Sequence, residues 1–136
     1  DCSWPCLKGD FTSMSANSSE STELHKVLTS FPHIVSNWES GDWSWDGRFS
    51  CPTAVVEDED RERALGILRK ELHTVYNHMN HQNLPGPLAR IIEFTGGLRP
   101  GQCILIDQGK GDVYRYALWW PWTNGVTVSI RLGQAK

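Results

Sequence analysis

The chain has 136 residues, of which 39% are hydrophobic and 21% charged, and these fractions are typical of a folded globular domain. The net charge is -3 and no run of Lys and Arg exceeds two residues, which argues against a whole-domain attraction to nucleic acid or to an anionic membrane. No apolar stretch approaches the roughly 20 residues that a membrane-spanning helix needs. We therefore expect one soluble domain over residues 1–136, with no membrane partner.

Residues 1–20 form a Ser-rich arm with few apolar side chains. Within this arm, Asn17-Ser18-Ser19 is the single N-glycosylation motif, and its polar surroundings suit a surface site at Asn17. A chain that begins at Asp1 without an initiator Met predicts a mature secreted form from which a signal peptide has been removed.

The four cysteines lack the paired CxxC spacings of a structural zinc site. Two disulfides in a secreted, extracellular protein are the better interpretation. Three connectivities are possible. We favour those in which each arm cysteine reaches a distant strand cysteine, because such closures restrict the unfolded chain most. The cysteines concerned are Cys2, Cys6, Cys51 and Cys103.

Two short elements and an aromatic loop follow the arm. Residues 21–28 have apolar side chains at helical spacing behind a Ser or Thr cap, which predicts a short helix. Residues 33–37 favour a brief strand. Residues 38–47 form a loop rich in Gly and Asp, with more tryptophans than a loop usually presents without a surface to bury them against: Trp38, Trp43 and Trp45.

The next segment predicts a strand and the main helix. Residues 48–56 favour a strand, and Pro52 indicates an edge position or a bulge. The acidic run at residues 57–60 would open the helix, because acidic side chains complement the macrodipole in a first turn. Apolar residues at helical spacing then predict one amphipathic helix from about residue 59 to about residue 80: Leu65, Leu68, Leu72, Val75, Tyr76 and Met79.

The C-terminal third favours strands. Residues 90–94 predict one strand, and three apolar runs follow at residues 103–107, 113–120 and 126–132. Glycine-containing turns separate these runs, and the second turn holds Asn124-Gly125, the strongest short hairpin signal, so we expect a three-stranded antiparallel meander. The predicted fold class is α+β, with one long amphipathic helix packed on an antiparallel sheet of four to five strands and stapled by two disulfides. An all-β sandwich with one added helix is the alternative.

Three histidines crowd the end of the predicted main helix. At about 100° per residue, His78 and His81 lie about 60° apart, whereas His73 lies about 140° from His78 on the other flank. The three rings cannot converge on one metal ion unless the helix breaks. We therefore expect no metal site and no cofactor, and histidines that serve as cations near a helix C-terminus.

A second set of residues suits phosphodiester cleavage. Arg115 and Arg131 lie on neighbouring predicted strands and Glu93 on another, so a carboxylate and two guanidiniums would meet on one sheet face. Glu93 would act as general base, His73 as general acid, and the arginines would bind the phosphate. The more ordinary interpretation, which we favour, is a set of cross-strand ion pairs on a solvated face.

The order of elements resembles a known group of proteins. Phe49-Ser50-Cys51, a loop, one long helix and a run of antiparallel strands resemble the small secreted guanyl-specific ribonucleases of fungi. They are closer still to the ribonuclease-like effectors that plant-pathogenic fungi secrete. The resemblance covers about residues 48–132. This chain has no histidine after His81, and residues 83–87 read Asn-Leu-Pro-Gly-Pro where that family has a Tyr-Pro-His segment. The resemblance therefore implies a ribonuclease-like scaffold that has lost its catalytic set.

Seven tryptophans are the most unusual feature of the composition. Consecutive strand residues face opposite sides, so Trp119 and Trp120 cannot both be core if one sheet face is solvated. Either the aromatic loop covers the sheet as a satellite cluster, or an exposed aromatic platform binds a protein or stacks on sugar rings. The candidate binding residues are Trp43, Trp45, Trp119, Trp120 and Trp122, and at least one of the last three should be partly exposed.

We therefore expect a small secreted interaction protein, a virulence effector without catalysis whose partner is a protein of a host. The first alternative is a secreted ribonuclease-like phosphodiesterase that acts on RNA. The second is a carbohydrate-binding module that uses surface tryptophans on a glycan.

Overall fold

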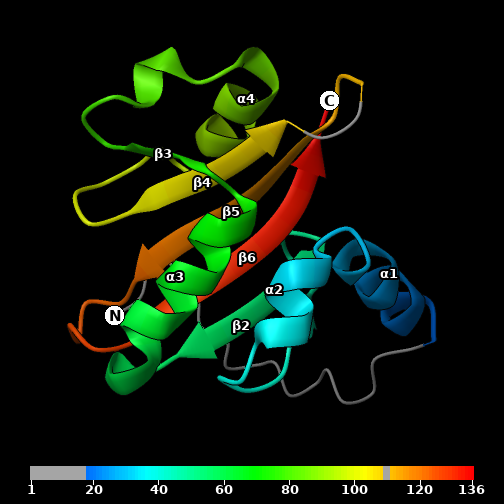
Figure 1. Cartoon of the computed structure of the whole chain (residues 1–136). Coiled ribbons are helices and arrows are strands. Elements are labelled where there is room, and N and C mark those ends of the chain that lie inside the picture. The colour runs from blue at the N-terminus through cyan, green and yellow to red at the C-terminus, as the bar shows by residue number, and fades with distance from the viewer. Residues whose placement is uncertain (1–17, 109–110) are drawn as a thin grey trace.

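The computed structural model describes residues 18–108 and 111–136 of the chain. These residues form one six-stranded antiparallel sheet, in the strand order β1-β2-β6-β5-β4-β3, with helices on both faces (Figure 1). The predicted α+β class is confirmed, and a sandwich of two sheets is excluded for the described residues. The sheet has six strands where four to five were predicted.

The predicted meander forms the centre of the sheet as β4 (Cys103–Gln108), β5 (Tyr114–Pro121) and β6 (Val128–Ala135). The turn between β5 and β6 follows from its residues. Gly125 adopts a φ of 82°, and Asn124 Oδ1 accepts hydrogen bonds from the backbone N–H groups of Val126 and Thr127 at 2.9 and 3.0 Å. An Asn side chain that replaces backbone acceptors in this way fixes a turn locally.

Three shorter strands complete the sheet. β2 (Cys51–Val56) pairs with β6, and β1 (Ser44–Asp46) pairs with β2 and forms one edge. β3 (Thr74–Asn77) pairs with β4 and forms the other edge. The predicted aromatic loop at residues 38–47 therefore ends in an edge strand.

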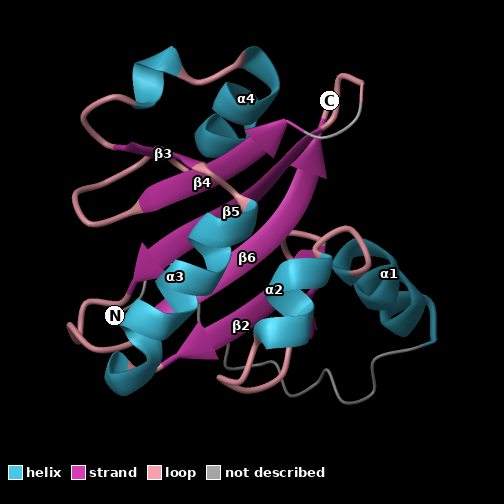
Figure 2. Cartoon of the chain, viewed as in Figure 1, coloured by secondary structure: helices cyan, strands magenta, loops and turns pink. Residues whose placement is uncertain are grey.

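Helices cover both faces of the sheet (Figure 2). On the front face lie α2 (Pro32–Asn37) and α3 (Arg61–Glu71), and α3 is preceded by the 3-10 turn η2 (Asp58–Asp60). On the back face lies α4 (Gly86–Phe94). Helix α1 (Ser18–Leu28) confirms the predicted short helix and contacts β1, β2 and β6, and a second 3-10 turn, η3 (His81–Asn83), precedes α4.

Strand alternation divides the core between the two faces. The front core joins α3 to sheet residues that include Leu105, Ala117, Trp119, Ile130 and Leu132. The back core joins Leu88 and Ile92 of α4 to Ile104, Ile106, Tyr116, Leu118 and Trp120. Because both faces are covered, consecutive strand residues such as Trp119 and Trp120 are both buried.

The prediction of one helix over residues 59–80 is wrong after Glu71. Helix α3 ends there, and Leu72 adopts an extended conformation with φ -119° and ψ 97°. The following residues pair with β4 from Thr74 opposite Ile106 to Asn77 opposite Cys103. A β-branched and aromatic segment gains a strand partner and a ladder of hydrogen bonds here, and this tertiary gain outweighs its helical spacing.

Two predicted strands are helices. Residues 90–94 belong to α4, in which Leu88 and Ile92, four residues apart, face the sheet, as helical spacing requires. Residues 33–37 belong to α2, which has Pro32 in its first turn and buries Ile34. β-Branched residues favoured a strand in both segments. Each segment instead lies on a face of the sheet, where a helix buries its apolar side chains.

The predicted staple of two disulfides is not found among the described residues. Cys51 and Cys103 are free, and they lie on opposite faces of the sheet: Cys51 on the back face beside Arg131, and Cys103 on the front face opposite Trp119. A bond between these two residues is therefore excluded. Cys2 and Cys6 lie outside the described residues.

The N-terminal predictions fall mostly outside the described part of the chain. Residues 18–20 of the predicted arm belong to α1, and residues 1–17, with the candidate glycosylation site Asn17, are outside it. Among the described residues, no helix has the length and apolar character needed to cross a membrane.

Candidate functional site

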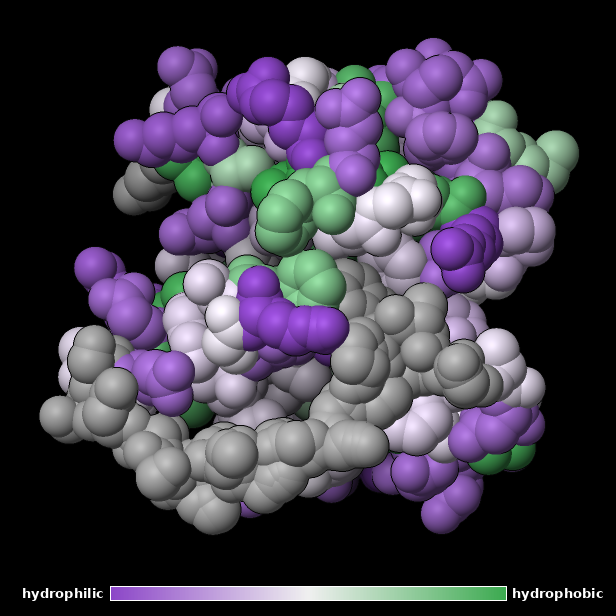
Figure 3. Space-filling view, turned by 180° about the vertical axis from the view of Figure 1, so that it is seen from behind, coloured by the Kyte–Doolittle hydropathy of each residue, from purple (hydrophilic) through white to green (hydrophobic). Residues whose placement is uncertain are grey.

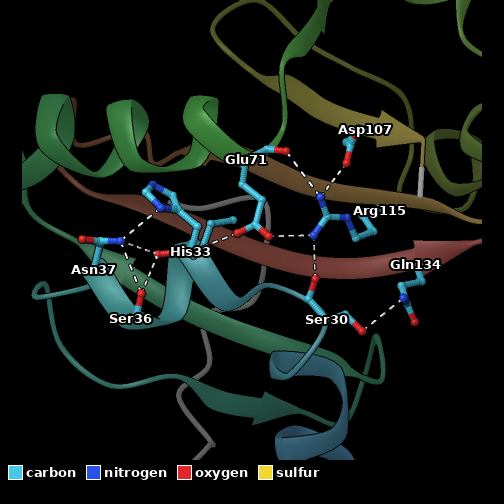
Figure 4. A network of polar contacts seen from close by, with 9 residues as sticks. Ser30, His33, Ser36, Asn37, Glu71, Asp107, Arg115 and Gln134 are labelled. Atoms are coloured by element: carbon cyan, nitrogen blue, oxygen red, sulfur yellow. Dashed lines mark hydrogen bonds and ion pairs between the residues drawn. The ribbon is translucent and has the colours of Figure 1, made fainter. Parts of the chain in front are cut away.

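Arg115, a predicted phosphate-binding residue, lies at the centre of a polar network on the front face (Figure 4). Its Nη1 atom donates to Glu71 Oε2 at 2.7 Å and to the carbonyl oxygen of Ser30 at 2.6 Å. Its Nη2 atom donates to Asp107 Oδ2. Glu71 Oε1 in turn accepts the backbone N–H of Ile34 at 2.9 Å. One guanidinium thus joins α3, β4 and the turn that leads into α2.

The charge state of Arg115 is fixed by these contacts. Burial by itself lowers the pKa of the guanidinium, but the hydrogen bonds and charges of Asp107 and Glu71 together raise it above its ordinary value. The side chain of Glu71 is 8% exposed and that of Arg115 is 18% exposed. Arg115 can bind a phosphate only by leaving carboxylates that it already neutralises, so its role here is structural.

Arg131 is engaged in a different network on the back face. It is 2% exposed, and its Nε and Nη2 atoms donate to Asp46 Oδ2 at 3.1 and 3.0 Å. Asp46 Oδ1 accepts the backbone N–H groups of Arg48 and Phe49, at 3.0 and 3.4 Å. The guanidinium also lies 5.5 Å from the ring centroid of Phe49. Arg131 therefore holds the β1–β2 turn against the sheet.

The two arginines do not meet on one sheet face, and that prediction is wrong. Arg131 pairs with Leu118, whose side chain belongs to the back core, whereas Arg115 shares the front face with Ala117. Cross-strand partners share a face, and Leu118, the partner of Arg131, lies three residues from Arg115 on β5, so the two arginine side chains lie on opposite faces. The Arg115–Asp107 pair between β5 and β4 is a cross-strand ion pair as predicted, but both arginines lie on covered faces of the sheet and not on a solvated one.

The other two nuclease candidates lie on separate elements. Glu93 is exposed on α4, not on a strand, and forms no ion pair with either arginine among the described residues. His73 is exposed in the connection between α3 and β3. The predicted general base, general acid and phosphate-binding pair are thus distributed over both faces and over different elements.

The histidines that were considered for metal binding are also dispersed. His73 follows α3, His78 follows β3, and His81 begins η3. Among the described residues, no three His, Cys, Asp or Glu side chains are gathered in a way that could hold a metal ion.

The tryptophans are mostly part of the core. Trp119 and Trp120 are 6% and 2% exposed on opposite faces. Trp122 is half-buried, as predicted for at least one of the three, and its Nε1 donates to Ser129 Oγ at 2.7 Å. In the loop, Trp38 and Trp43 pack with ring centroids 4.8 Å apart against the front core.

Trp45 lies in β1 opposite Pro52 and is also half-buried. Trp38 and Trp43 therefore cover the sheet as the predicted aromatic cluster, and none of the three loop tryptophans is fully exposed. Trp4 lies outside the described residues.

An open cavity of about 510 Å³ lies at the start of α3. Arg61 beside it donates to the carbonyl oxygen of Gly125 at 3.1 Å and lies 3.6 Å from Asp58. The lining has three carboxylates and one guanidinium and holds no nucleophile or histidine: it consists of Asp58, Glu59, Arg61, Glu62, Leu65 and Trp119.

A different surface is exposed on the back of the molecule. Phe94, the last residue of α4, is 70% exposed, and its ring meets that of Phe49 edge-on, with centroids 5.8 Å apart and planes at 85°. The guanidinium of Arg48 lies 5.4 Å from the Phe49 centroid. Arg90 precedes Phe94 by one helical turn. We call Arg48, Phe49, Arg90 and Phe94 the Phe94 patch.

Sequence reasoning missed this patch because it placed residues 90–94 in a strand. The signal was present in the sequence. Leu88 and Ile92 are spaced by four residues behind Pro87, which is typical of a helix with one buried side. On such a helix Phe94 falls outside the buried stripe.

Comparisons with known proteins found no match: no protein-family model, no curated protein and no solved structure is similar to this chain.

Proposed function

We propose that this protein acts by binding a partner protein and that it is a small secreted effector directed at a host, without catalysis of its own. The observation that carries the proposal is Phe94. A large aromatic side chain that is 70% exposed beside a second aromatic ring is unfavourable in water and is typical of protein-binding surfaces.

The ribonuclease alternative has less support. A phosphodiesterase needs its base, its acid and its phosphate-binding cations around one phosphate. Arg115 and Arg131 are instead engaged with Glu71, Asp107 and Asp46 on opposite faces. The carbohydrate alternative needs open indole faces, and the described tryptophans are buried or half-buried.

The proposal is tested in two parts. For the first, the purified protein is incubated with single-stranded RNA beside a Glu93→Gln variant. We expect no hydrolysis above the buffer blank by either protein. Hydrolysis that is lost in Glu93→Gln would establish the ribonuclease alternative.

For the second part, the protein is fused to a biotin ligase and expressed in plant tissue beside the ligase alone. We expect a reproducible set of labelled host proteins, at least one of which binds the purified protein in solution. Retention on chitin in place of such a protein would favour the carbohydrate alternative.

A further inference from the structure

We propose that the Phe94 patch docks a segment of the partner protein in which carboxylates flank an apolar or aromatic side chain. This inference rests on the proposed function and adds to it the surface and the chemistry of the partner. Figure 3 shows the back of the molecule, where apolar side chains, coloured green, are exposed among polar ones over α4.

The apolar half of the recognition comes from Phe94. Its ring lies at the end of α4 with 70% of its surface exposed, and the edge-on contact with Phe49 leaves the rest of the ring accessible. A partner side chain that packs on this ring removes apolar surface of both molecules from water. Aromatic and arginine side chains are also the types that most often dominate binding at interfaces.

The charged half comes from Arg48 and Arg90. Both are exposed, and neither forms an ion pair with a carboxylate in residues 18–108 and 111–136. Arg90 lies about 40° from Phe94 around the helix axis, whereas the carboxylate of Glu93 lies about 100° away. The Arg48 guanidinium lies over the Phe49 ring, and that of Arg90 extends along α4 toward Gly86, where a Cβ would lie 3.9 Å from its Nη1 atom.

The four residues of the Phe94 patch include two cations and no carboxylate, on a chain whose net charge is -3. The four consecutive acidic residues at 57–60 lie at the start of α3, which packs on the front face. A Cβ at Gly47 would lie 3.9 Å from Glu20 Oε2, so one carboxylate borders the turn that carries Arg48. The two arginines of the patch, beside its aromatic pair, are complementary to an anionic and apolar segment. Single-stranded RNA is less well matched, because its affinity depends on many phosphate contacts and the patch offers two cations.

The patch is held in place before any partner binds. Asp46 accepts the backbone N–H groups of Arg48 and Phe49 and is itself paired with Arg131. Ser50, the next residue, has a φ of 52° and is the only residue other than glycine with a positive φ in the described ranges. A turn fixed in this way loses little conformational entropy on binding.

The test uses peptides displayed on phage as the probe. A random twelve-residue library is selected on the purified full chain, and the enriched peptides are synthesised and measured by fluorescence polarisation. We expect Asp or Glu on either side of an apolar or aromatic residue. Affinity should fall at least about tenfold in Phe94→Ala and in the double variant Arg48→Glu/Arg90→Glu. Peptides with Lys in place of their carboxylates should regain binding to the double variant.

Met79→Ala is the matched control, because Met79 is 72% exposed on the turn after β3 and lies outside the patch. Its affinity should stay within about twofold of the parent chain. Circular dichroism establishes that each variant is folded, and Phe94→Gln replaces the alanine variant if that one is not. Equal binding by Phe94→Ala, or enriched peptides without carboxylates, would overturn the proposal.

Two other occupants are tested in the same samples. A labelled twelve-nucleotide RNA that binds more tightly than the peptides, and is lost in Phe94→Ala, would make the patch a nucleic-acid surface and overturn the inference. Self-association in analytical ultracentrifugation that Phe94→Ala abolishes would make the occupant a second copy and would also overturn it. If labelling of host proteins persists in Phe94→Ala, the docking surface is wrong while the proposed function stands.

Discussion

Arg115 and Arg131 lie on adjacent strands and are both paired with carboxylates, yet they hold different parts of the molecule. Arg115 contacts two carboxylates and the carbonyl oxygen of Ser30 on the front face, and so attaches helices to the sheet. Arg131 contacts Asp46 on the back face and attaches the β1–β2 turn. Strand alternation alone decides which peripheral element each arginine serves.

The comparison also shows why a cluster of charged residues on neighbouring strands is a weak indication of catalysis. Each guanidinium on this sheet is matched by carboxylates from elements that the sheet must hold. Several cations form no ion pair among the described residues, and two of them, Arg48 and Arg90, belong to the Phe94 patch. Their availability makes that surface the better candidate for binding.

The largest expected effect is a loss of folding stability, and it differs between variants of the two arginines. Arg115→Leu should lower the free energy of unfolding by about 3–5 kcal/mol, because it leaves the buried carboxylate of Glu71 unpaired beside Asp107. Arg131→Leu should cost about 1–3 kcal/mol, since Asp46 is more exposed and keeps two backbone N–H donors. Urea denaturation followed by tryptophan fluorescence measures both. A larger loss in Arg131→Leu would reverse the comparison.

The second effect concerns side-chain packing on the back face, where Gly133 lies opposite Tyr116. A Cβ at Gly133 would lie 2.4 Å from the hydroxyl oxygen of Tyr116 and 2.5 Å from its Cζ, and Tyr116 is buried. Gly133→Ala should therefore cost about 1–3 kcal/mol by overpacking. The control is Gly66→Ala in α3, where nothing lies within 4 Å of the new Cβ and a stabilisation of about 0.5–1 kcal/mol is expected. Equal thermal midpoints for the two variants would contradict this packing.

The smallest expected effect is a difference in reactivity between the two thiols, which lie on opposite faces of the sheet. Burial raises the pKa of Cys51 from 9.0 to about 12, against a lowering effect of Arg131, and burial raises the pKa of Cys103 from 9.0 to about 11. In native protein at pH 8, Cys103 should react with iodoacetamide about tenfold faster than Cys51, because thiolate is the reactive form. Peptide mass spectrometry measures this ratio, and faster labelling of Cys51 would contradict the order.

The same shifts predict how stability depends on pH. The folded-state pKa values are raised, so both thiols stay protonated in the folded chain while those of the unfolded chain ionise above about pH 9. The stabilisation is complete below pH 9 and should be lost as the pH rises toward 11 and 12. Urea midpoints at pH 8 and pH 10.5, compared with those of the double variant Cys51→Ala/Cys103→Ala, isolate this contribution. An equal decrease in the variant would assign the loss to other groups.

Elements whose causes are local could be predicted from neighbouring residues. Asn124-Gly125 specifies the β5–β6 turn through the Asn side chain and a positive φ, and the meander around it was predicted with nearly its observed strands. The short helix at residues 21–28 and the start of α3 after the acidic run were predicted for the same reason. These signals act within a few residues and depend little on the rest of the chain.

Segments that fit both a helix and a strand pattern take their secondary structure from contacts distant in the sequence. Val75 and Tyr76 fit a helical stripe and a strand equally well, and the free edge of β4 made them a strand. Ile91 and Ile92 have high strand propensity, but as a helix this segment buries Leu88 and Ile92 against the back face of the sheet and leaves Phe94 exposed. The candidate site follows from that choice, because burial and register depend on contacts between residues far apart in the sequence.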